Sequence, residues 1–400
     1  MKEFIGRFWI LGAGEHQVPL IIAAKKRMLE VITIDNKSEN PGHKISHLHF
    51  SNVSITDHDK LLSLAKSFPP NAIASSASDL GARACAIISK DLGLSGPNSE
   101  AVLKLTRKDL FRELCRNLNL PCPKFCIVDF DNQTDEIPPL PVIIKPVDRS
   151  GSVCVKTIHK KSEIPNAVKA AINASICKKA IIEQKIEKCG PQICGDGFAR
   201  KGRVKFNLFG DGYFHDHKFQ TTPFAESFPS THGEDIQKKI VDQLNLIFET
   251  TGYDNGPFNV DAIKTIDHEV YILDIGPRCG GNYIPELIEL QTGVNLIDHY
   301  IDQCLGLDPK PFLRMYNKPK FNASYMIHWT HKPVNFKSYS IKKEFKRFIL
   351  KERCFKNSGA IIEPLSDGSK SIGNLIMEFP DITTLRKFFS EKEIPVEINY

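Results

Sequence analysis

The sequence predicts an α/β protein in three parts, and three observations support this. The first hundred residues alternate short apolar runs with helical patterns, which is typical of βαβ units around a parallel sheet. The middle of the chain adds further apolar runs around one long amphipathic helix. Beyond Gly306 the pattern changes to strands and a closing helix. We therefore expect an N-terminal domain over residues 1–105, a central domain over 106–310 and a small α+β lobe over 311–400.

Three apolar runs are the strand candidates of the N-terminal domain. They are Phe8 to Leu11, Val31 to Ile34 and Ala72 to Ala74, and a helical pattern through Leu20 and Ile21 separates the first two. Parallel strands need a crossover connection, which is usually a helix. This order of elements therefore predicts a parallel sheet.

The turn after the first strand, Gly12-Ala13-Gly14, has the start of a dinucleotide-binding motif, and Asp35 ends the second strand about where a ribose ligand would lie. The third glycine of that motif is replaced by Gln17, so close packing of the helix on the strand around a pyrophosphate is not assured. A tight structural turn is therefore the favoured interpretation, and NAD binding is the alternative.

A helix is predicted to open the central domain at Thr106, which we assign as its N-cap, with Asp109 three residues later. Pro121 and Pro123 end it, because proline cannot continue a helix. Its apolar face is formed by Leu110, Phe111, Leu114, Cys115 and Leu118.

The rest of the central domain is read as strands with two further helices. Strands are expected around two turns, Gly210-Asp211-Gly212 and Asp267-His268, and a long helix separates these hairpins. The strand candidates before them are Phe125 to Val128, Val142 to Lys145, Val153 to Thr157 and Ala180 to Ile186, with a helix near 163–175. The long helix has Ile236, Ile240, Leu244 and Ile247 in phase.

The C-terminal lobe is expected to contain a strand at Ser324 to His328 and a hairpin about Ser366-Asp367-Gly368. A closing helix follows Asp381, and Leu385 and Phe388 belong to its apolar face. The two boundaries, near 105 and 310, are placed where the pattern of elements changes.

Composition excludes several classes of protein. With 41% apolar and 25% charged residues, the chain is typical of a globular protein with sizeable cores. Its net charge of +6 is spread along the chain rather than gathered into a patch, so nucleic-acid binding is not favoured. The eleven cysteines include no CxxC pair and so indicate neither a zinc site nor a redox dithiol. Their odd number favours reduced thiols and a cytoplasmic location. The apolar run at Phe8 to Leu11 is too short to cross a membrane, and no membrane partner is expected.

Lys145 ends an apolar strand, VIIKP, at a position where a buried strand would prefer another hydrophobic residue. A short loop of small residues follows, and it includes Ser150, Gly151 and Ser152. Glycine and serine let backbone N–H groups approach phosphate oxygens, and a lysine on a strand supplies a positioned positive charge. The pattern predicts a phosphate site, with an ordinary hairpin as the alternative.

Two further segments extend this site. The strand Ile181 to Ile186 turns polar at its end and can offer backbone groups to an adenine edge, although an ordinary edge strand looks the same. Asp261 and Asp274 lie on successive strands joined by a turn, so a hairpin can bring them together. Paired carboxylates need a cation to offset their repulsion, which favours a divalent metal site over a structural role. Arg278 follows Asp274 by four residues.

Together, these features resemble the ATP-grasp superfamily, which contains biotin carboxylase, carbamoyl phosphate synthetase, D-alanine ligases and L-amino acid ligases. The resemblance covers residues 1 to about 310, from the ILGAG turn to LTRKDLFRELCRNLNLPCPKF, VIIKPVDRSGSVCV, IIEQKI and NVDAIKTIDHEVYILDIGPRCGGNYIPELIELQTGVNL. It implies a Rossmann-like N-terminal domain, a two-lobed core that holds ATP between sheets, and a C-terminal lobe that completes the substrate side.

The resemblance also implies roles for single residues. Lys108 and Lys145 match two phosphate-contacting lysines, and Ser150 to Ser152 match the loop that covers the phosphates. Glu183 and Ile186 match the adenine-side hinge. The metal positions are Asp261 and Asp274, and Arg278 matches the arginine that holds the carboxylate or acyl phosphate, which with Lys145 forms the expected catalytic pair.

The chain departs from the family pattern at two positions. Gly276 stands where many members have an asparagine metal ligand, and Gln192 replaces the usual glutamate near the ribose. The expected activity is an ATP-dependent ligation of a small carboxylate to an amine through an acyl phosphate, with ATP and Mg²⁺ or Mn²⁺ and release of ADP and phosphate. The alternatives are a bicarbonate-activating carboxylase, a phosphotransferase without ligation and a non-catalytic nucleotide-binding module. The oligomeric state is left open, with a homodimer as one alternative.

Overall fold

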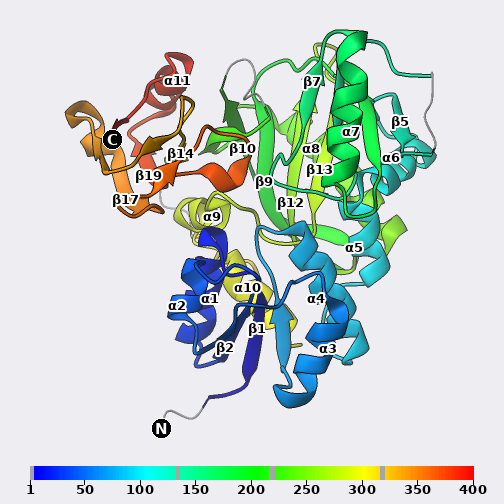
Figure 1. Cartoon of the computed structure of the whole chain (residues 1–400), viewed down its shortest axis with the longest axis vertical. Coiled ribbons are helices and arrows are strands. Elements are labelled where there is room, and N and C mark those ends of the chain that lie inside the picture. The colour runs from blue at the N-terminus through cyan, green and yellow to red at the C-terminus, as the bar shows by residue number, and fades with distance from the viewer. Residues whose placement is uncertain (1–3, 132–135, 216–220, 316–319) are drawn as a thin grey trace.

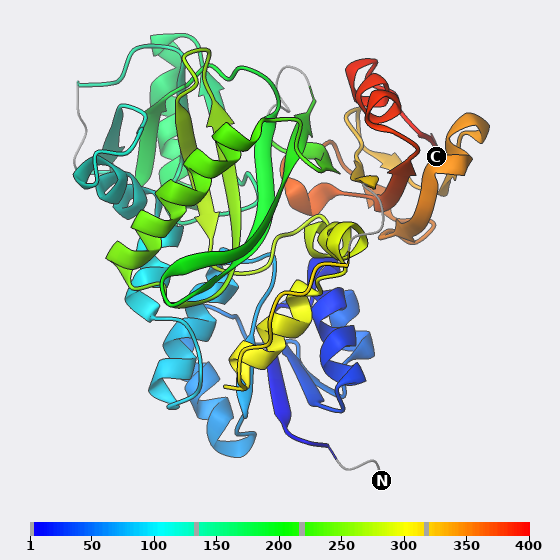
Figure 2. The same cartoon turned by 180° about the vertical axis from the view of Figure 1, so that it is seen from behind.

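The computed structural model describes residues 4–131, 136–215, 221–315 and 320–400 (Figure 1). They form a mixed α/β structure with a parallel sheet at the N-terminus, a small antiparallel sheet and a long antiparallel sheet. Figure 2 shows the long helix α8 lying across the back of the long sheet. None of the described helices combines the length and the apolar composition that a membrane span needs.

The N-terminal sheet is parallel, as the alternation of apolar runs and helices predicts. Its strand order is β3-β2-β1-β4, and helices α1 to α4 accompany it. Helix α10, from much later in the chain, packs on the same domain and contributes Tyr300 and Ile301 to its core. The bounds are β1 (Arg7–Leu11), α1 (Val18–Lys26), β2 (Glu30–Ile34), α2 (Pro41–Ile45), β3 (Leu48–Phe50), α3 (His58–Ser67), β4 (Ala72–Ala74), α4 (Asp79–Asp91) and α10 (Leu296–Cys304).

The small sheet has the strand order β5-β8-β6-β7, and all its neighbours are antiparallel. Helix α7 covers one face and buries Ile164, Val168 and Ile172 against it. The expected strand from Val153 begins only at Lys156, because the chain first makes a turn. The bounds are β5 (Phe125–Val128), β6 (Val142–Pro146), β7 (Lys156–Ile158), α7 (Ile164–Ala174) and β8 (Ala180–Gln184).

The long sheet has eight strands in the order β13-β12-β9-β10-β11-β14-β19-β17. It crosses the boundary expected near residue 310, because β11 pairs directly with β14. The predicted long helix is confirmed as α8, whose four in-phase isoleucine and leucine residues are all buried against the sheet. The bounds are α8 (Glu234–Thr251), β9 (Gln192–Arg200), β10 (Arg203–Phe214), β11 (Pro223–Phe228), β12 (Asn255–Lys264), β13 (Val270–Gly276), β14 (Phe321–Ile327), β17 (Ile349–Cys354) and β19 (Gly373–Phe379).

The remaining elements connect these sheets or extend the C-terminal lobe. The predicted closing helix is confirmed as α11, and the side chain of Asp381 caps it by accepting from the Thr384 N–H at 2.7 Å. The bounds are α5 (Ser99–Thr106), α6 (Lys108–Asn117), α9 (Ile284–Thr292), α11 (Ile382–Ser390), β15 (Val334–Asn335), β16 (Ser338–Ile341), β18 (Ile361–Ile362) and β20 (Val396–Asn399), with 3₁₀ turns at Glu15–Gln17, Lys161–Glu163, Lys343–Phe348 and Gly368–Lys370.

Three expectations about local structure are wrong. Thr106 is the last residue of α5 rather than the N-cap of α6, because its hydroxyl bonds back to the carbonyl of Val102 at 2.7 Å. Gly210-Asp211-Gly212 lies inside β10 and not in a turn, and the chain reverses instead at Lys201 and Gly202. The segment around Asp367 is not a simple hairpin, because β18 pairs with β15 while β19 joins the long sheet.

Candidate functional site

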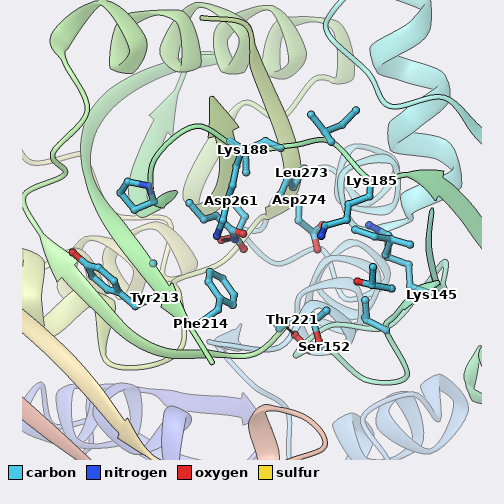
Figure 3. Close-up of a pocket in the computed structure, with 18 of the residues that line it drawn as sticks. Lys145, Ser152, Lys185, Lys188, Tyr213, Phe214, Thr221, Asp261, Leu273 and Asp274 are labelled. Carbon is cyan, nitrogen blue, oxygen red and sulfur yellow. Dashed lines mark hydrogen bonds between the residues drawn. The ribbon is translucent and has the colours of Figure 1, made fainter. Parts of the chain in front are cut away.

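A cavity of about 810 Å³ lies between the small sheet and the long sheet. Figure 3 shows side chains from both sheets pointing into it, among them Lys145, Ser152, Asp261 and Asp274. Helix α11 adds Arg386 to its wall. The predicted site residues that line it are Lys108, Lys145, Ser150, Gly151, Ser152, Glu183, Ile186, Asp261 and Asp274.

Lys145 and Glu183 form a buried ion pair on neighbouring strands of the small sheet. The Lys145 Nζ lies 2.6 Å from Glu183 Oε2, and the Arg112 Nε donates to the other carboxylate oxygen at 2.7 Å. Burial lowers the pKa of Lys145, although Glu183 acts against it. Burial alone would raise the pKa of Glu183, but Arg112 and Lys145 hold it below its usual value. The Glu183 side chain is thus committed to two cations, which leaves its backbone for any contact with a base.

Arg112 is a member of the site that sequence reasoning missed. It is fully buried on α6, and its guanidinium also donates to the carbonyl oxygens of Ile272 and Leu273 on β13. A charged residue between the buried Phe111 and Cys115 on one helix face is the signal that could have revealed it.

Lys108 connects the first turn of α6 to the long sheet. Its Nζ donates to Asp274 Oδ2 at 3.0 Å and to the carbonyl oxygen of Arg149 at 3.0 Å. Burial would raise the pKa of Asp274, but Lys108 and Lys145 hold it below its usual value. The other carboxylate oxygen, Oδ1, is buried and has no hydrogen-bond partner within the described parts of the chain.

Asp261 lies directly opposite Asp274 in the ladder between β12 and β13. Burial raises the pKa of Asp261 to about 6; a hydrogen bond from Gln192 at 2.9 Å opposes this shift, and the nearby Asp274 adds to it. Gln192, expected near a ribose, therefore points its amide at this carboxylate. A carboxylate without a cation and an unpartnered oxygen opposite it are completed by a divalent cation, so both residues fit a metal. No cluster of three or more histidine, cysteine or acidic residues suited to a metal occurs in the described ranges.

The loop of Ser150, Gly151 and Ser152 lies at the rim of the cavity. Gly151 and Ser152 have positive φ values of 68° and 63°, a backbone conformation that glycine adopts readily. The Gly151 carbonyl accepts from the Gly368 N–H at 3.1 Å, and the Ser152 hydroxyl donates to the Thr221 carbonyl. The loop thus contacts the C-terminal lobe and the segment before β11 of the long sheet.

Arg278 lies outside the lining of this cavity. Its guanidinium is buried against Asp79, the first residue of α4, at 2.9 Å for Nη2 and 3.1 Å for Nε. A Cβ at Gly276 would stand only 2.6 Å from the Arg278 Cζ. Arg278 therefore fills the space that an asparagine side chain at position 276 would need.

The glycine turn at the N-terminus has its hydrogen-bonding groups satisfied within the protein. The Ala13 N–H donates to Asp35 Oδ2 at 2.9 Å, and the Gly14 N–H donates to Gln17 Oε1 at 2.9 Å. The Gln17 amide in turn donates to the Ser76 carbonyl at 2.5 Å. This network favours the structural turn over the dinucleotide alternative, because the same donors would have to bind a pyrophosphate.

Several other lining residues were not predicted as site residues. Lys185 and Lys188 come from the segment after β8, and the Lys188 Nζ lies 4.9 Å from the centre of the Phe214 ring. Arg386 and Phe389 come from α11, far away in the chain. The folding of the C-terminal lobe against the long sheet brings these two residues of α11 to the cavity.

Two relatives match the larger part of the chain at low identity. An uncharacterized protein of Sinorhizobium fredii is 22% identical over 307 residues, which is 72% of this chain and 58% of that protein. The formate-dependent phosphoribosylglycinamide formyltransferase of Methanocaldococcus jannaschii is 24% identical over 287 residues, which is 68% of this chain and 69% of that enzyme. The chain thus spans less than two thirds of the first of these relatives. No family model matches the chain.

Solved structures match the whole chain. The L-amino acid ligase of Bacillus licheniformis has a TM-score of 0.82 at 17% identity, with 100% of both chains covered. Phosphoribosylglycinamide synthetase of Anaerococcus prevotii has 0.76 at 22%, covering 98% of this chain and 99% of that one. The biotin carboxylase domain of the Hydrogenobacter thermophilus 2-oxoglutarate carboxylase, solved with MgADP and bicarbonate, has 0.75 at 16%, covering 100% and 91%.

The fold is that of the ATP-grasp ligases. The resemblance drawn from the sequence is therefore confirmed at the level of the fold, and it extends through the C-terminal lobe, which the sequence motifs did not reach. The division into three domains stays a prediction, and so do the roles of the single residues.

Proposed function

We propose that the protein is an ATP-dependent ligase that activates a carboxylate as an acyl phosphate and joins it to an amine. One observation carries the proposal: two lysines, Lys108 and Lys145, and two facing aspartates line a single cavity together with a loop of glycine and serine. Lys108 and Lys145 offer positive charge to phosphates, and Asp261 and Asp274 offer oxygen ligands to a cation. The fold shared with ligases supports the same reaction class.

Asp261 and Asp274 would hold Mg²⁺ or Mn²⁺. When bound, the metal supplies positive charge that offsets the charge of the ATP phosphates. Lys108 already donates to Asp274, so its ammonium group would lie beside both the metal and the phosphate oxygens that the metal would hold. The backbone N–H groups of Ser150 to Ser152 cover the phosphates, and the backbone from Glu183 to Ile186 faces the adenine.

The proposed chemistry has two steps. A carboxylate oxygen of the acid attacks the γ-phosphorus of ATP in line, the bond to the bridging oxygen breaks, and ADP leaves. The amine then attacks the carbonyl carbon of the acyl phosphate, phosphate leaves with its bonding electrons, and the amine loses a proton. Lys145 stabilises the charge on the transferring group because its position is fixed by Glu183. Arg278 holds the acid by exchanging or sharing its contact with Asp79.

Trapping with hydroxylamine tests this proposal, because hydroxylamine converts an acyl phosphate to a hydroxamate whatever the natural amine is. The chain is incubated with MgATP, hydroxylamine and pools of small carboxylic acids, and hydroxamate and ADP are measured together. We expect equal amounts of the two products. Turnover that needs bicarbonate instead would favour the carboxylase, and no turnover with any acid would favour the non-catalytic module.

Replacing Lys145 provides the matching test of the site. We expect Lys145→Ala to lower hydroxamate formation by about 100-fold, because one such electrostatic contact is typically worth about 3 kcal/mol in the barrier. The fold should tolerate the change, since Arg112 still neutralises Glu183. Lys156→Ala, on an exposed position of the neighbouring strand β7, is the control and should react like the original chain. Near-normal turnover of Lys145→Ala would remove Lys145 from the site.

A further inference from the structure

Helix α6 places two cationic side chains beside the strand that carries Asp274. Lys108 and Arg112 are four residues apart, so they lie on the same face of the helix. Lys108 Nζ donates to the Asp274 carboxylate at 3.0 Å, and Arg112 Nη2 donates to the carbonyl oxygen of Leu273 at 2.7 Å. One helix therefore contacts both the side chain of the proposed metal ligand and the backbone immediately before it.

Strand β13, which carries these groups, lies at one end of the long sheet. Polar backbone groups at the edge of a sheet lack the partners that a ladder provides, and they need other partners when they are buried. Arg112 is such a partner for Leu273, and it makes a longer contact to the Ile272 carbonyl oxygen, 3.4 Å from its Nη1. The Arg112 guanidinium is thereby held on the end strand of the long sheet.

The same guanidinium also binds the small sheet. Its Nε donates to Glu183 Oε1 at 2.7 Å, and Glu183 Oε2 lies 2.6 Å from Lys145 Nζ. The side chains of Arg112 and Glu183 are 0% and 4% exposed, so a Glu183 carboxylate that lost either cation would be costly to keep ionised. An unbroken series of contacts thus runs from β13 through Arg112 and Glu183 to Lys145.

This series joins two groups that enter the cavity from different sheets. Lys145 belongs to β6 of the small sheet and Asp274 to β13 of the long sheet, and Figure 3 shows both pointing into the cavity. The two sheets share no ladder in the described parts of the chain, so contacts between them set the distance from Lys145 to Asp274. Arg112 does not line the cavity. It can therefore affect the reaction only through the residues that it holds.

We propose that Arg112 is a positioning residue that fixes Lys145 relative to Asp274, and so relative to the phosphate that is transferred. The inference rests on the proposed ligase function, and it adds a residue that contacts neither the substrates nor the metal. The planar guanidinium suits this role because its N–H donors have a fixed geometry and reach a carboxylate and a backbone carbonyl together. A displacement of a reacting group by about 1 Å can slow a reaction about 100-fold.

The test is a double-mutant cycle between Arg112→Lys and Lys145→Ala, measured as the kcat of hydroxamate formation at saturating MgATP, acid and hydroxylamine. Arg112→Lys keeps a positive charge beside the buried Glu183 but loses the planar set of donors. In the original chain we expect this change to lower kcat by about 30-fold. In the Lys145→Ala chain it should lower kcat by less than about threefold, because the group that Arg112 positions is gone.

A merely structural role for Arg112 would give a different result. The loss of folded protein would then be the same with and without Lys145, so kcat would fall by the same factor in both chains. Equal factors would overturn the inference. Arg116→Lys, one turn further along α6 in an exposed ion pair with Glu113, is the control and should leave kcat unchanged. Circular dichroism and thermal unfolding establish that each variant is folded before its kinetics are measured.

A second variant tests the same series of contacts if Arg112→Lys does not fold. Glu183→Asp keeps the negative charge, but its side chain is one methylene shorter and cannot reach both Arg112 and Lys145 where they now lie. We expect it to lower kcat by about tenfold in the original chain and to have no effect in the Lys145→Ala chain. An unchanged kcat in folded Glu183→Asp would also overturn the inference.

The outcomes separate this inference from the ligase function. If the original chain forms no hydroxamate with any acid, the ligase function falls. The same cycle is then measured by calorimetry as the dissociation constant of MgATP. A smaller effect of Arg112→Lys in the Lys145→Ala chain would keep Arg112 as the residue that positions Lys145 in the nucleotide site, and equal effects in both chains would overturn that role.

Discussion

Single residues explain why this cavity departs from the pattern that its sequence resembles. Gly276 lacks the side chain of an asparagine ligand, and the guanidinium of Arg278 lies in the space this leaves. Gln192 lacks the charge of a glutamate, and its amide donates to Asp261 instead of facing a ribose. Both departures therefore change a neighbour: Arg278 fills the space at position 276, and Asp261 accepts a hydrogen bond from Gln192. A sequence motif shows which residue is substituted, but it does not show which neighbouring side chain changes its position or its hydrogen bond as a result.

The paired aspartates lead to a prediction about ligand-dependent stability. Asp274→Asn should abolish the protection that MgATP gives against thermal unfolding, because a bound ligand stabilises the folded state in proportion to its affinity. In the original chain this protection is about 2.7 kcal/mol at 100 times the dissociation constant. Thermal unfolding with and without MgATP measures it. Asp267→Asn, in the exposed turn between β12 and β13, is the control and should keep full protection. Unchanged protection in Asp274→Asn would show that the pair is structural.

Arg278 supports a prediction that separates acid binding from nucleotide binding. A guanidinium binds a carboxylate through two parallel hydrogen bonds, whereas lysine offers a point charge. Arg278→Lys should therefore raise the apparent KM for the acid by about tenfold and leave the affinity for an ATP analogue unchanged. Steady-state kinetics and calorimetry measure the two effects. Arg203→Lys, in an exposed ion pair with Glu249, is the control. A large loss of nucleotide binding with unchanged acid kinetics would place Arg278 on the nucleotide side.

At the scale of elements, the sequence predicts well where one residue pattern decides the structure. The helix α8 and the strands β1, β2 and β4 follow their apolar patterns, because burial of one face fixes each of them. The glycines of Gly210-Asp211-Gly212 mislead, because glycine marks turns in most chains, whereas here Gly210 lets the Phe228 ring and the Ser227 carbonyl approach the strand closely. Asp211 is held by Ser230 and Thr231, a contact across 19 and 20 positions that no local pattern reveals.

The ends of β10 and β14 lead to a prediction about pH. His328 is buried next to His215, with a ring-to-ring nitrogen distance of 3.2 Å, and its Nε2 lies 3.1 Å from the Ser371 hydroxyl. Burial, with a contribution from His215, lowers the pKa of His328 to about 3. The unfolded chain therefore binds one proton more than the folded chain between pH 3 and 6.5. Stability from this group is complete above pH 6.5 and falls as the pH drops toward 3, by about 1.4 kcal/mol per pH unit.

Urea unfolding at pH 7 and pH 5 measures this effect. The free energy of unfolding of the original chain should fall on going from pH 7 to pH 5. In His328→Asn this fall should be smaller by about 2 kcal/mol, because the variant has no ring at position 328 to protonate. His331→Asn replaces an exposed histidine three residues later and should show the original dependence. An identical pH dependence in His328→Asn and the original chain would show that another group is responsible. His16, whose pKa burial lowers to about 4, acts in the same direction in both chains.

At the scale of the whole molecule, the long sheet joins the C-terminal lobe to the cavity. Strand β11 pairs with β14 from Ala225 to Phe228, and Phe224 packs in the same core as Phe389 of α11. The sequence shows a change of pattern near residue 310, but it cannot show that the strands on both sides share one sheet. Strand order depends on contacts between residues that are far apart in the chain. For the same reason the sequence does not indicate that residues of α11 line the cavity.

This continuity predicts the outcome of a truncation. A chain that ends at residue 310 would expose the unpaired edge of β11 and the apolar side chains that now face the C-terminal core. We expect it to aggregate or to lack a cooperative unfolding transition, as size-exclusion chromatography and circular dichroism would show. The full chain under the same conditions is the reference. A soluble monomer whose unfolding MgATP still delays would instead establish the first 310 residues as an independent unit.

The contact between the loop of Ser150 to Ser152 and the C-terminal lobe has a consequence for motion. The eight strands of the long sheet are held together by their ladders, whereas no described strand of the small sheet pairs with them, and side chains such as Arg112 and Ser152 bridge the two sheets. Widening the cavity by rotating the small sheet would break the hydrogen bond from the Gly368 N–H to the Gly151 carbonyl. Exchange of that one amide hydrogen with solvent deuterium therefore counts opening events, and a bound nucleotide should slow it. The exchange rate of the Gly368 amide, in the C-terminal lobe, would thus report how often the cavity opens, although the cavity is lined mainly by other parts of the chain.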